Sequence, residues 1–202
     1  MPGDAATTAN NIMANGLLFR IGFVSDLIHE TIFLLVAWTL YVLLKPVNKN
    51  HALLMVMLAL VSVSIQSINL LIQFAAVELL SGASYLTVFA ADQLRAQVMF
   101  FLNLQNHGII IAQIFSGLWA LPLGFLVYKS GFLPRILGIL LMIGAFGFPI
   151  DSIQYFLFPR YRAIISLVVI MPAVIGVVSL NLWLLFKGVN VEEWEKRALE
   201  SA

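Results

Sequence analysis

The hydrophobic residues of this chain form five long and nearly unbroken stretches. They cover approximately Ile21–Leu44, Ala52–Ala76, Gln97–Tyr128, Pro134–Phe158 and Ala163–Phe186. A transmembrane helix needs about 20 consecutive apolar residues, and each stretch is long enough. Strands of a membrane barrel are much shorter and alternate apolar with polar residues, which these stretches do not. The pattern therefore predicts an all-α fold, a polytopic transmembrane helical bundle with about five spans.

Short polar segments separate the stretches and contain the residues at which helices end. These segments are Lys45-Pro46-Val47-Asn48, Ser81-Gly82, Ser130-Gly131 and Phe158-Pro159-Arg160. Proline cannot continue a helix, and glycine is common just after one. We therefore predict three parts: an extracytoplasmic interfacial N-terminal segment over 1–20, a single transmembrane bundle over 21–187 with an outer loop at 77–96, and a short cytoplasmic tail over 188–202.

The composition supports a membrane protein and excludes several other classes. Hydrophobic residues make up 61% of the 202 residues and charged residues 10%, and the mean hydropathy is +0.99. A soluble domain carries about 25% charged residues, so soluble enzymes and secreted scaffolds are excluded and the lipid bilayer is a partner. The net charge of +1 gives no reason to expect nucleic acid as a partner. The absence of cysteine excludes disulfides, thiolate metal sites and a cysteine nucleophile.

The basic residues between the stretches predict the orientation. One face carries seven, namely Lys45, Lys49, Lys129, Arg135, Lys187, Lys196 and Arg197, and the other carries four, namely Arg20, Arg95, Arg160 and Arg162. Cytoplasmic loops of membrane proteins are enriched in Lys and Arg, so the first face is predicted to be cytoplasmic. We therefore expect a multi-pass protein of the cytoplasmic membrane with its N-terminus outside and its C-terminus inside.

Polar side chains inside the spans are the candidate functional residues, because such groups are costly in lipid. Asp26, His29 and Glu30 are spaced i, i+3 and i+4 and so share one helix face, roughly 9 to 15 Å below the predicted outer boundary. The later spans contribute Gln66, Asn69 and Gln73, then Asn103, Asn106 and His107, and finally Asp151 and Gln154. With alternating topology, all of these positions fall in the outer half of the membrane. They predict a polar cavity that opens to the outside.

Several chemistries fit these residues. A cavity that binds a small molecule, a lipid headgroup or a partner is our leading hypothesis, with no catalytic residue and no enzyme activity assigned. A divalent metal held by His29, Glu30, His107 and Asp151 could instead activate water for hydrolysis of a lipid-like substrate. His29 and His107 could also be the axial ligands of a haem. The remaining alternatives are a proton-coupled permeation path and a purely structural polar network, in which Arg20 or Arg95 compensates the acidic residues.

A structural role in a larger complex is a further alternative. Small residues let transmembrane helices approach closely, and they recur at positions that include Gly117, Gly124, Gly138 and Gly176. If these faces are free, they would bind a membrane-protein partner or a second copy of the chain. Pro149 is a separate structural feature, because it leaves the carbonyl of Ala145 without its helical hydrogen bond and predicts a kink just before Asp151.

Motifs spread over nearly the whole chain carry a family resemblance. They are Gly3-Asp4-Ala5-Ala6, Leu18-Phe19-Arg20, Ser25-Asp26-Leu27, Lys45-Pro46-Val47-Asn48, His107-Gly108, Gly117-Leu118-Trp119, Pro122-Leu123-Gly124, Ser130-Gly131-Phe132-Leu133-Pro134-Arg135, Ile150-Asp151-Ser152 and Trp183-Leu184-Leu185-Phe186-Lys187-Gly188-Val189. With these motifs the chain resembles the uncharacterised membrane-protein family described as domain of unknown function 4386.

The resemblance implies a bacterial or archaeal multi-span protein of the cytoplasmic membrane, and it assigns no activity and no cofactor. It places five charged or polar residues in recurring motifs, namely Arg20, Asp26, His107, Arg135 and Asp151. Family members usually have another apolar helix before the Gly3-Asp4-Ala5 motif. The resemblance therefore implies a six-span family topology that lacks its first helix here.

Overall fold

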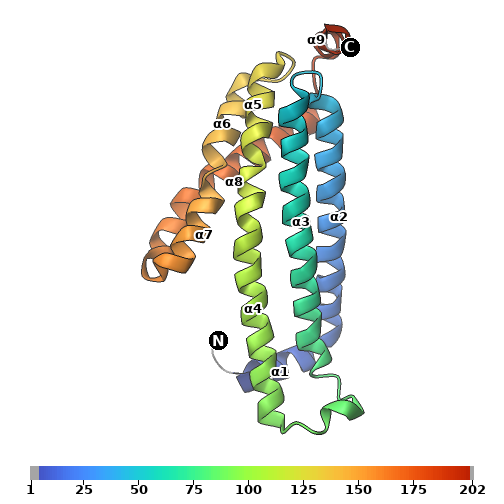
Figure 1. The fold of residues 1–202 in the computed structure, drawn as a ribbon, viewed down its shortest axis with the longest axis vertical. Helices are drawn as coiled ribbons and strands as arrows, with labels where there is room; N and C mark the ends of the chain where they lie inside the picture. The colour runs from blue at the N-terminus through green and yellow to red at the C-terminus, as the bar shows by residue number, and fades with distance from the viewer. Residues whose placement is uncertain (1–4, 201–202) are drawn as a thin grey trace. The chain divides into compact units, whose positions relative to one another are not determined.

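The structure, a computed structural model, describes residues 5–200, without the side chains of residues 161–165. In this range the chain is built from helices: α1 (Ala5–Ala14), α2 (Gly16–Leu44), α3 (Lys49–Glu78), the short 3-10 helix η1 (Ser84–Leu86), α4 (Ala91–Leu118), α5 (Ala120–Ser130), α6 (Arg135–Gly144), α7 (Gly147–Leu157), the 3-10 helix η2 (Pro159–Tyr161), α8 (Arg162–Phe186) and α9 (Val191–Glu200). Figure 1 shows them in chain order. The ends of the predicted terminal segments, 1–4 and 201–202, and the side chain of Arg162 lie outside the described residues.

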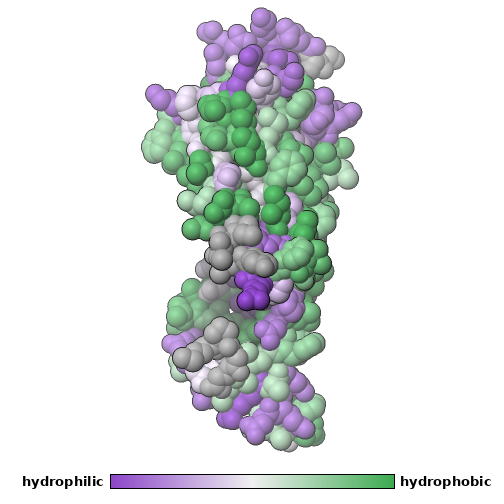
Figure 2. Space-filling view, turned by 90° about the vertical axis from the view of Figure 1, so that its left-hand side faces the viewer, coloured by the Kyte–Doolittle hydropathy of each residue, from purple (hydrophilic) through white to green (hydrophobic). Residues whose placement is uncertain are grey.

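The predicted all-α membrane fold is confirmed. In the described part of the chain, five helical segments are long and apolar enough to cross a membrane: Gly16–Leu44, Lys49–Glu78, Ala91–Ser130, Arg135–Leu157 and Ser166–Phe186. Large apolar side chains lie on the outside of these segments, and Leu17, Leu71 and Leu185 are 75%, 69% and 75% exposed. Figure 2 shows hydrophobic side chains, in green, over much of the visible surface of the helices. Such a surface is suited to lipid, so the chain has the makeup of a multi-pass membrane protein.

Prolines break two of the spans. The third span consists of α4 and α5, which meet at Trp119, and Pro122 follows three residues later. The fourth consists of α6 and α7, and it breaks at Ala145 and Phe146, as the position of Pro149 predicts. The proline nitrogen has no hydrogen to donate to the carbonyl four residues earlier, and the loss of that hydrogen bond favours a kink or a break there. In α8 the helix continues through Pro172.

The outer loop predicted at 77–96 is shorter in the structure, because the helices on both sides extend into it. α3 continues to Glu78, and α4 begins at Ala91, where the side chain of Gln93 accepts a hydrogen bond from the backbone N–H of Ala90 at 3.0 Å. Within the loop, the Tyr85 hydroxyl donates to the Glu78 carboxylate at 3.0 Å. This hydrogen bond raises the pKa of Tyr85 above its ordinary value of 10.0.

The contacts within the chain define two compact units, each of which contains segments from several helices. Unit 1 comprises residues 1–32 and 63–109, and unit 2 comprises residues 33–62 and 110–202. In unit 1, α1 buries Ile12 against Ala76 of α3 and Val98 of α4. The rings of Phe23 on α2 and Phe74 on α3 lie 5.4 Å apart. Unit 1 therefore holds together parts of α1, α2, α3 and α4.

Unit 2 contains the larger apolar core and the predicted close-packing glycines. Its core includes Leu44, Met55, Leu123, Leu126 and Leu141. A Cβ atom on any of four glycines would lie within 3.1 Å of atoms of another helix of this unit, and these glycines are Gly117, Gly124, Gly138 and Gly176. The prediction that these residues allow close helix packing is confirmed. Their partners are helices of the same chain, so these four positions are not free faces for another protein.

Within unit 2, hydrogen bonds hold the tail helix α9 against the ends of other helices. The Trp194 indole Nε1 donates to the carbonyl oxygen of Leu43 at 2.9 Å, and Arg197 Nη2 donates to the carbonyl oxygen of Lys129 at 3.1 Å. Leu43 and Lys129 lie in the last turns of α2 and α5, where backbone carbonyls have no partner within their own helix. The side chain of Asn190 caps α9 itself by accepting from the N–H of Glu193 at 3.3 Å.

Candidate functional site

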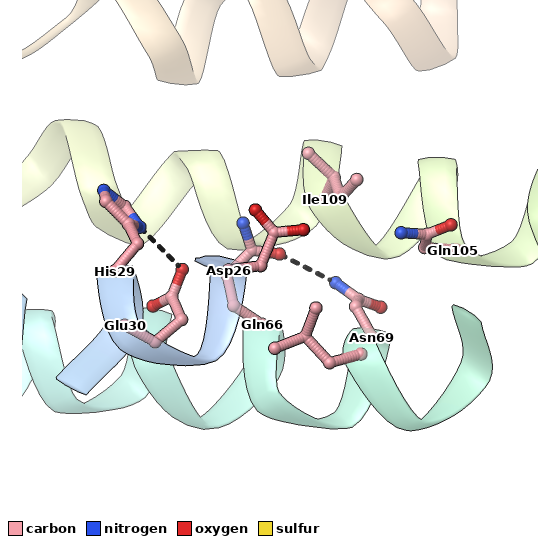
Figure 3. A pocket seen from close by; sticks show the side chains of 8 residues that line it. Asp26, His29, Glu30, Gln66, Asn69, Gln105 and Ile109 are labelled. Atoms are coloured by element: carbon pink, nitrogen blue, oxygen red, sulfur yellow. Dashed lines mark hydrogen bonds and ion pairs between the residues drawn. The ribbon is translucent and has the colours of Figure 1, made fainter. Parts of the chain in front are cut away.

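The candidate site is a cavity of about 240 Å³ among the helices of unit 1. Figure 3 shows labelled side chains from three helices around it. Six of the eight lining residues carry polar side chains, and two are aliphatic. The lining consists of Asp26, His29 and Glu30 on α2, Gln66, Asn69 and Leu70 on α3, and Gln105 and Ile109 on α4. Five of the predicted site residues are thus brought together here.

The residues from α2 form both the rim and the interior of the cavity. His29 Nδ1 lies 3.4 Å from Glu30 Oε1, and the two side chains differ greatly in exposure, at 74% for His29 and 12% for Glu30. Asp26 is also exposed. We therefore place Asp26 and His29 at the rim and the Glu30 carboxylate inside. The i, i+3, i+4 spacing places all three on one face of α2, as the sequence predicts.

The residues from α3 form a hydrogen-bonded wall. Asn69 Nδ2 donates to Gln66 Oε1 at 3.0 Å, and the Asn69 residue is only 4% exposed. Gly108 on α4 makes this arrangement possible, because a Cβ atom at this position would overlap the side-chain amide of Asn69. The absence of a side chain at Gly108 therefore lets α4 approach α3 and keeps the Asn69 amide beside the cavity.

On α4, the residues predicted from the sequence are not the ones that line this cavity. Asn103, Asn106 and His107 are exposed residues of α4, and the polar side chain of α4 that lines the cavity is Gln105. A signal for Gln105 was present in the sequence. It lies in the apolar stripe that runs from Val98 through Leu102, Gln105 and Ile109 to Ala112 at spacings of three and four. A polar residue within such a stripe is directed toward neighbouring helices rather than toward lipid.

Gln73 was also predicted to belong to the site, and it lies on α3 two turns beyond Gln66. It does not line the cavity. Its side-chain oxygen Oε1 is buried and has no hydrogen-bond partner among the described residues. Gln73 therefore shares the stripe of Gln66 and Asn69 without sharing their position at the cavity.

Asp151 and Gln154 are buried on α7 in unit 2, where they are 1% and 6% exposed. The Ser166 hydroxyl of α8 donates to the Asp151 carboxylate. The side-chain oxygen and nitrogen of Gln154 have no partner among the described residues. Asp151 thus contributes to the packing of α7 on α8, and its predicted convergence with the residues of α2 and α3 stays a prediction.

The two predicted charge partners lie elsewhere. Arg95 Nη1 contacts Asp92 Oδ1 at 3.2 Å, one turn away on α4, and Arg20 is an exposed residue of α2. Among the described residues, the cavity lining includes neither Lys nor Arg. The carboxylates of Asp26 and Glu30 therefore have His29 as the one lining group that can carry a positive charge.

The described residues do not contain a group of three or more His, Asp and Glu side chains positioned to hold a metal ion. The predicted metal set of His29, Glu30, His107 and Asp151, and the haem pair of His29 and His107, stay predictions. What the cavity offers chemically is oxygen: two carboxylates and three side-chain amides within membrane-spanning helices. Ionised carboxylates only accept hydrogen bonds, so the site is suited to a molecule that donates them.

Comparisons with known proteins place the chain in a family. The model of the family described as a domain of unknown function, DUF4386, matches residues 1–188. An uncharacterised protein from Archaeoglobus fulgidus is 32% identical over 158 residues, which cover 78% of this chain and 78% of that protein. No solved structure matches. The chain therefore belongs to the DUF4386 family, an uncharacterised family whose apolar helices here form the spans of a multi-pass membrane protein.

Proposed function

We propose that this protein binds a small polar ligand, either a soluble molecule or the headgroup of a lipid, in the cavity between α2, α3 and α4. The observation that carries the proposal is the polar lining of that cavity within apolar helices. Carboxylates and amides in a membrane span are costly unless they are paired or functional. Two carboxylates and three side-chain amides, together with the His29 imidazole, line one space here.

The size of the cavity supports a ligand of modest dimensions. A volume of about 240 Å³ has room for roughly eight water molecules at about 30 Å³ each. This volume is slightly below the usual range for small-molecule sites, which is about 300 to 1,000 Å³. A headgroup or a metabolite with a few polar atoms is suited to this space. The aliphatic side chains of Leu70 and Ile109 would contact its apolar part.

The test compares bound species in matched variants. Native mass spectrometry of the protein, extracted in mild detergent, identifies the small molecules and lipids that it retains. Gln66→Leu combined with Gln105→Leu keeps the approximate volume of two lining side chains and removes their polar atoms. Gln73→Leu is the control, because it makes the same change on α3 outside the cavity. We expect the retained species in the parent and in Gln73→Leu, and its loss in the double variant.

Two results would refute the proposal. One is a bound species that the double variant retains as well as the parent does. The other is a parent protein that carries no bound species even when it is extracted directly into lipid nanodiscs. Circular dichroism spectra of the three proteins show whether a loss of binding reflects a loss of fold.

We also propose that the N-terminus lies outside the cytoplasmic membrane and the C-terminus inside. The support is the count of seven Lys and Arg residues against four on the two sides of the spans. Fusion of a reporter that is active only in the cytoplasm to the C-terminus is expected to give an active protein. An inactive reporter there, with an active one after Glu78, would reverse the orientation.

A further inference from the structure

We infer that the ligand of this cavity is a cation with N–H donors, a primary ammonium group. This inference rests on the proposed function, because it names the class of ligand that the cavity would hold. Such a group could belong to a free amine or to the amino headgroup of a lipid. The two sources share the chemistry that the lining recognises, and the experiment separates them.

The charge of the lining is the first reason. Asp26 and Glu30 contribute two negative charges when ionised, and among the described lining residues only His29 can offset one of them. With both carboxylates ionised, the lining carries a net negative charge whether His29 is neutral or protonated. An unpaired carboxylate within a membrane span is costly. A cationic ligand would remove that cost, whereas an anionic ligand would increase it.

The arrangement of acceptors is the second reason. A primary ammonium group donates three hydrogen bonds and accepts none. The interior of the cavity offers the Glu30 carboxylate, and the side-chain amides of Gln66, Asn69 and Gln105 add three further oxygen atoms to the lining. Hydrogen bonds between an ammonium group and a carboxylate are charge-assisted and about twice as strong as neutral ones.

The absence of aromatic side chains from the lining, as far as the described residues go, is the third reason. Quaternary ammonium groups have no N–H to donate, and proteins recognise them through the faces of aromatic rings. This cavity provides carboxylates and amides instead. It should therefore prefer a primary ammonium group to its trimethylated counterpart, although both carry the same charge.

The experiment measures binding of two matched probes, ethanolamine and choline, to the full chain in detergent micelles by isothermal titration calorimetry. We expect ethanolamine to bind at least about tenfold more tightly than choline, because only ethanolamine makes charge-assisted hydrogen bonds. Glu30→Gln and Asp26→Asn should each weaken ethanolamine binding at least about tenfold. Asp92→Asn is the control, since Asp92 is an exposed acid on α4 with 93% of its side chain accessible.

A second arm identifies the source of the ammonium group. The protein is placed in nanodiscs with equal amounts of phosphatidylethanolamine and phosphatidylcholine, and the lipids retained after detergent extraction are counted by native mass spectrometry. Preferential retention of phosphatidylethanolamine, lost in Glu30→Gln, identifies a lipid headgroup. Ethanolamine binding without a lipid preference identifies a free amine. Both results support the inference.

Four results would overturn the inference. Equal affinities for ethanolamine and choline would show that N–H donation is not recognised. Binding of calcium or zinc, lost in Glu30→Gln and without any response to either amine, would assign the carboxylates to a metal. No calorimetric response to ethanolamine, together with no lipid preference, would remove ammonium as the ligand class. The fourth is a neutral or anionic species that the parent retains and the double variant Gln66→Leu with Gln105→Leu loses. In that case the proposed function stands and this inference fails.

Discussion

Gly138 lies where α6 packs against α5, and it has no room for a side chain. A Cβ atom there would lie 2.5 Å from the carbonyl oxygen of Gly124, and 2.6 and 2.9 Å from the backbone nitrogen and Cα of Tyr128. Favourable contacts between carbon atoms require about 3.5 to 4.0 Å. All three neighbours are backbone atoms, so no side chain can rotate away. Gly138→Ala therefore forces α6 to move away from α5 by about 1 Å.

The expected cost follows from two opposing effects. Overpacking of a well-packed interface costs about 1 to 3 kcal/mol. Replacing glycine by alanine in the middle of a helix returns at most about 1 kcal/mol. We expect a net destabilisation of about 1 to 2 kcal/mol, and for a chain of this length each kcal/mol lowers the melting temperature by about 2 to 4 °C. The melting temperature should therefore fall by roughly 2 to 8 °C.

Gly22→Ala is the matched control, since Gly22 is a helical glycine of α2 whose added Cβ would meet no atom within 4 Å. It should leave the melting temperature unchanged or raise it slightly. The assay is thermal unfolding in detergent micelles, followed by the helical circular dichroism signal. If Gly138→Ala melts at or above the temperature of the parent protein while Gly22→Ala behaves as expected, then α5 and α6 do not pack as described and the reasoning is refuted.

Three further predictions concern single polar groups. Gln73→Leu should stabilise the protein by about 1 to 3 kcal/mol in chemical unfolding, because it removes a buried side-chain oxygen that has no partner among the described residues. Trp194→Phe should destabilise it by about 0.5 to 1.5 kcal/mol and make the tail more sensitive to protease, because the hydrogen bond to the carbonyl of Leu43 is lost. Glu78→Gln should lower the pKa of Tyr85 in an ultraviolet titration, because the carboxylate acceptor that raises it is removed.

The direction of the pH effect at Tyr85 follows from linkage. The folded-state pKa lies above the ordinary value of 10.0, so the hydrogen bond to Glu78 stabilises the fold fully below that value and is lost as the pH rises through the folded-state pKa. Tyr85→Phe identifies the titration step among the five tyrosines. An unchanged Tyr85 pKa in Glu78→Gln would contradict this prediction.

The other two predictions have equally direct controls. Gln66→Leu is the control for Gln73→Leu, and it should be less stabilising because it removes the acceptor of the Asn69 amide. Equal effects of the two changes would contradict the assignment of Gln73 Oε1 as a buried oxygen without a partner among the described residues. Trp183→Phe changes another tryptophan, one on α8, and it should leave protease sensitivity of the tail unchanged. Equal sensitivity in Trp194→Phe and Trp183→Phe would show that the indole does not hold the tail.

The spans could be predicted because the bilayer imposes a simple requirement on sequence. Twenty or so apolar residues and a breaking Gly or Pro define a helix without any knowledge of its neighbours. The break before Pro149 was predictable for the same reason, since it depends on a hydrogen bond within one helix. The extension of α3 and α4 into the predicted outer loop could not be predicted, because the polar residues there are compatible with a loop or with a helix. In the structure, the side chain of Gln93 caps the start of α4.

The site could be predicted only in part, because it depends on which face of each helix meets its neighbours. Asp26, His29 and Glu30 share a face by spacing alone, and they do line the cavity. His107 was predicted because it is a histidine in a span, yet the polar α4 residue at the cavity is Gln105, which the apolar stripe around it places on the inner face. A prediction from chemical reactivity favours His107, whereas a prediction from helix periodicity favours Gln105.

The hydrogen bond from Trp194 to the carbonyl of Leu43 joins positions 151 residues apart, and this separation has a consequence for biosynthesis. At about 5 to 20 residues per second, the ribosome reaches Trp194 roughly 8 to 30 s after it has made Leu43. Throughout that interval the end of α2 is without its indole donor, while α3 to α8 are being inserted. The last turn of α2, an early span, is therefore completed only when α9 has been made. A ribosome that stalls between them leaves unit 2 inserted but incomplete.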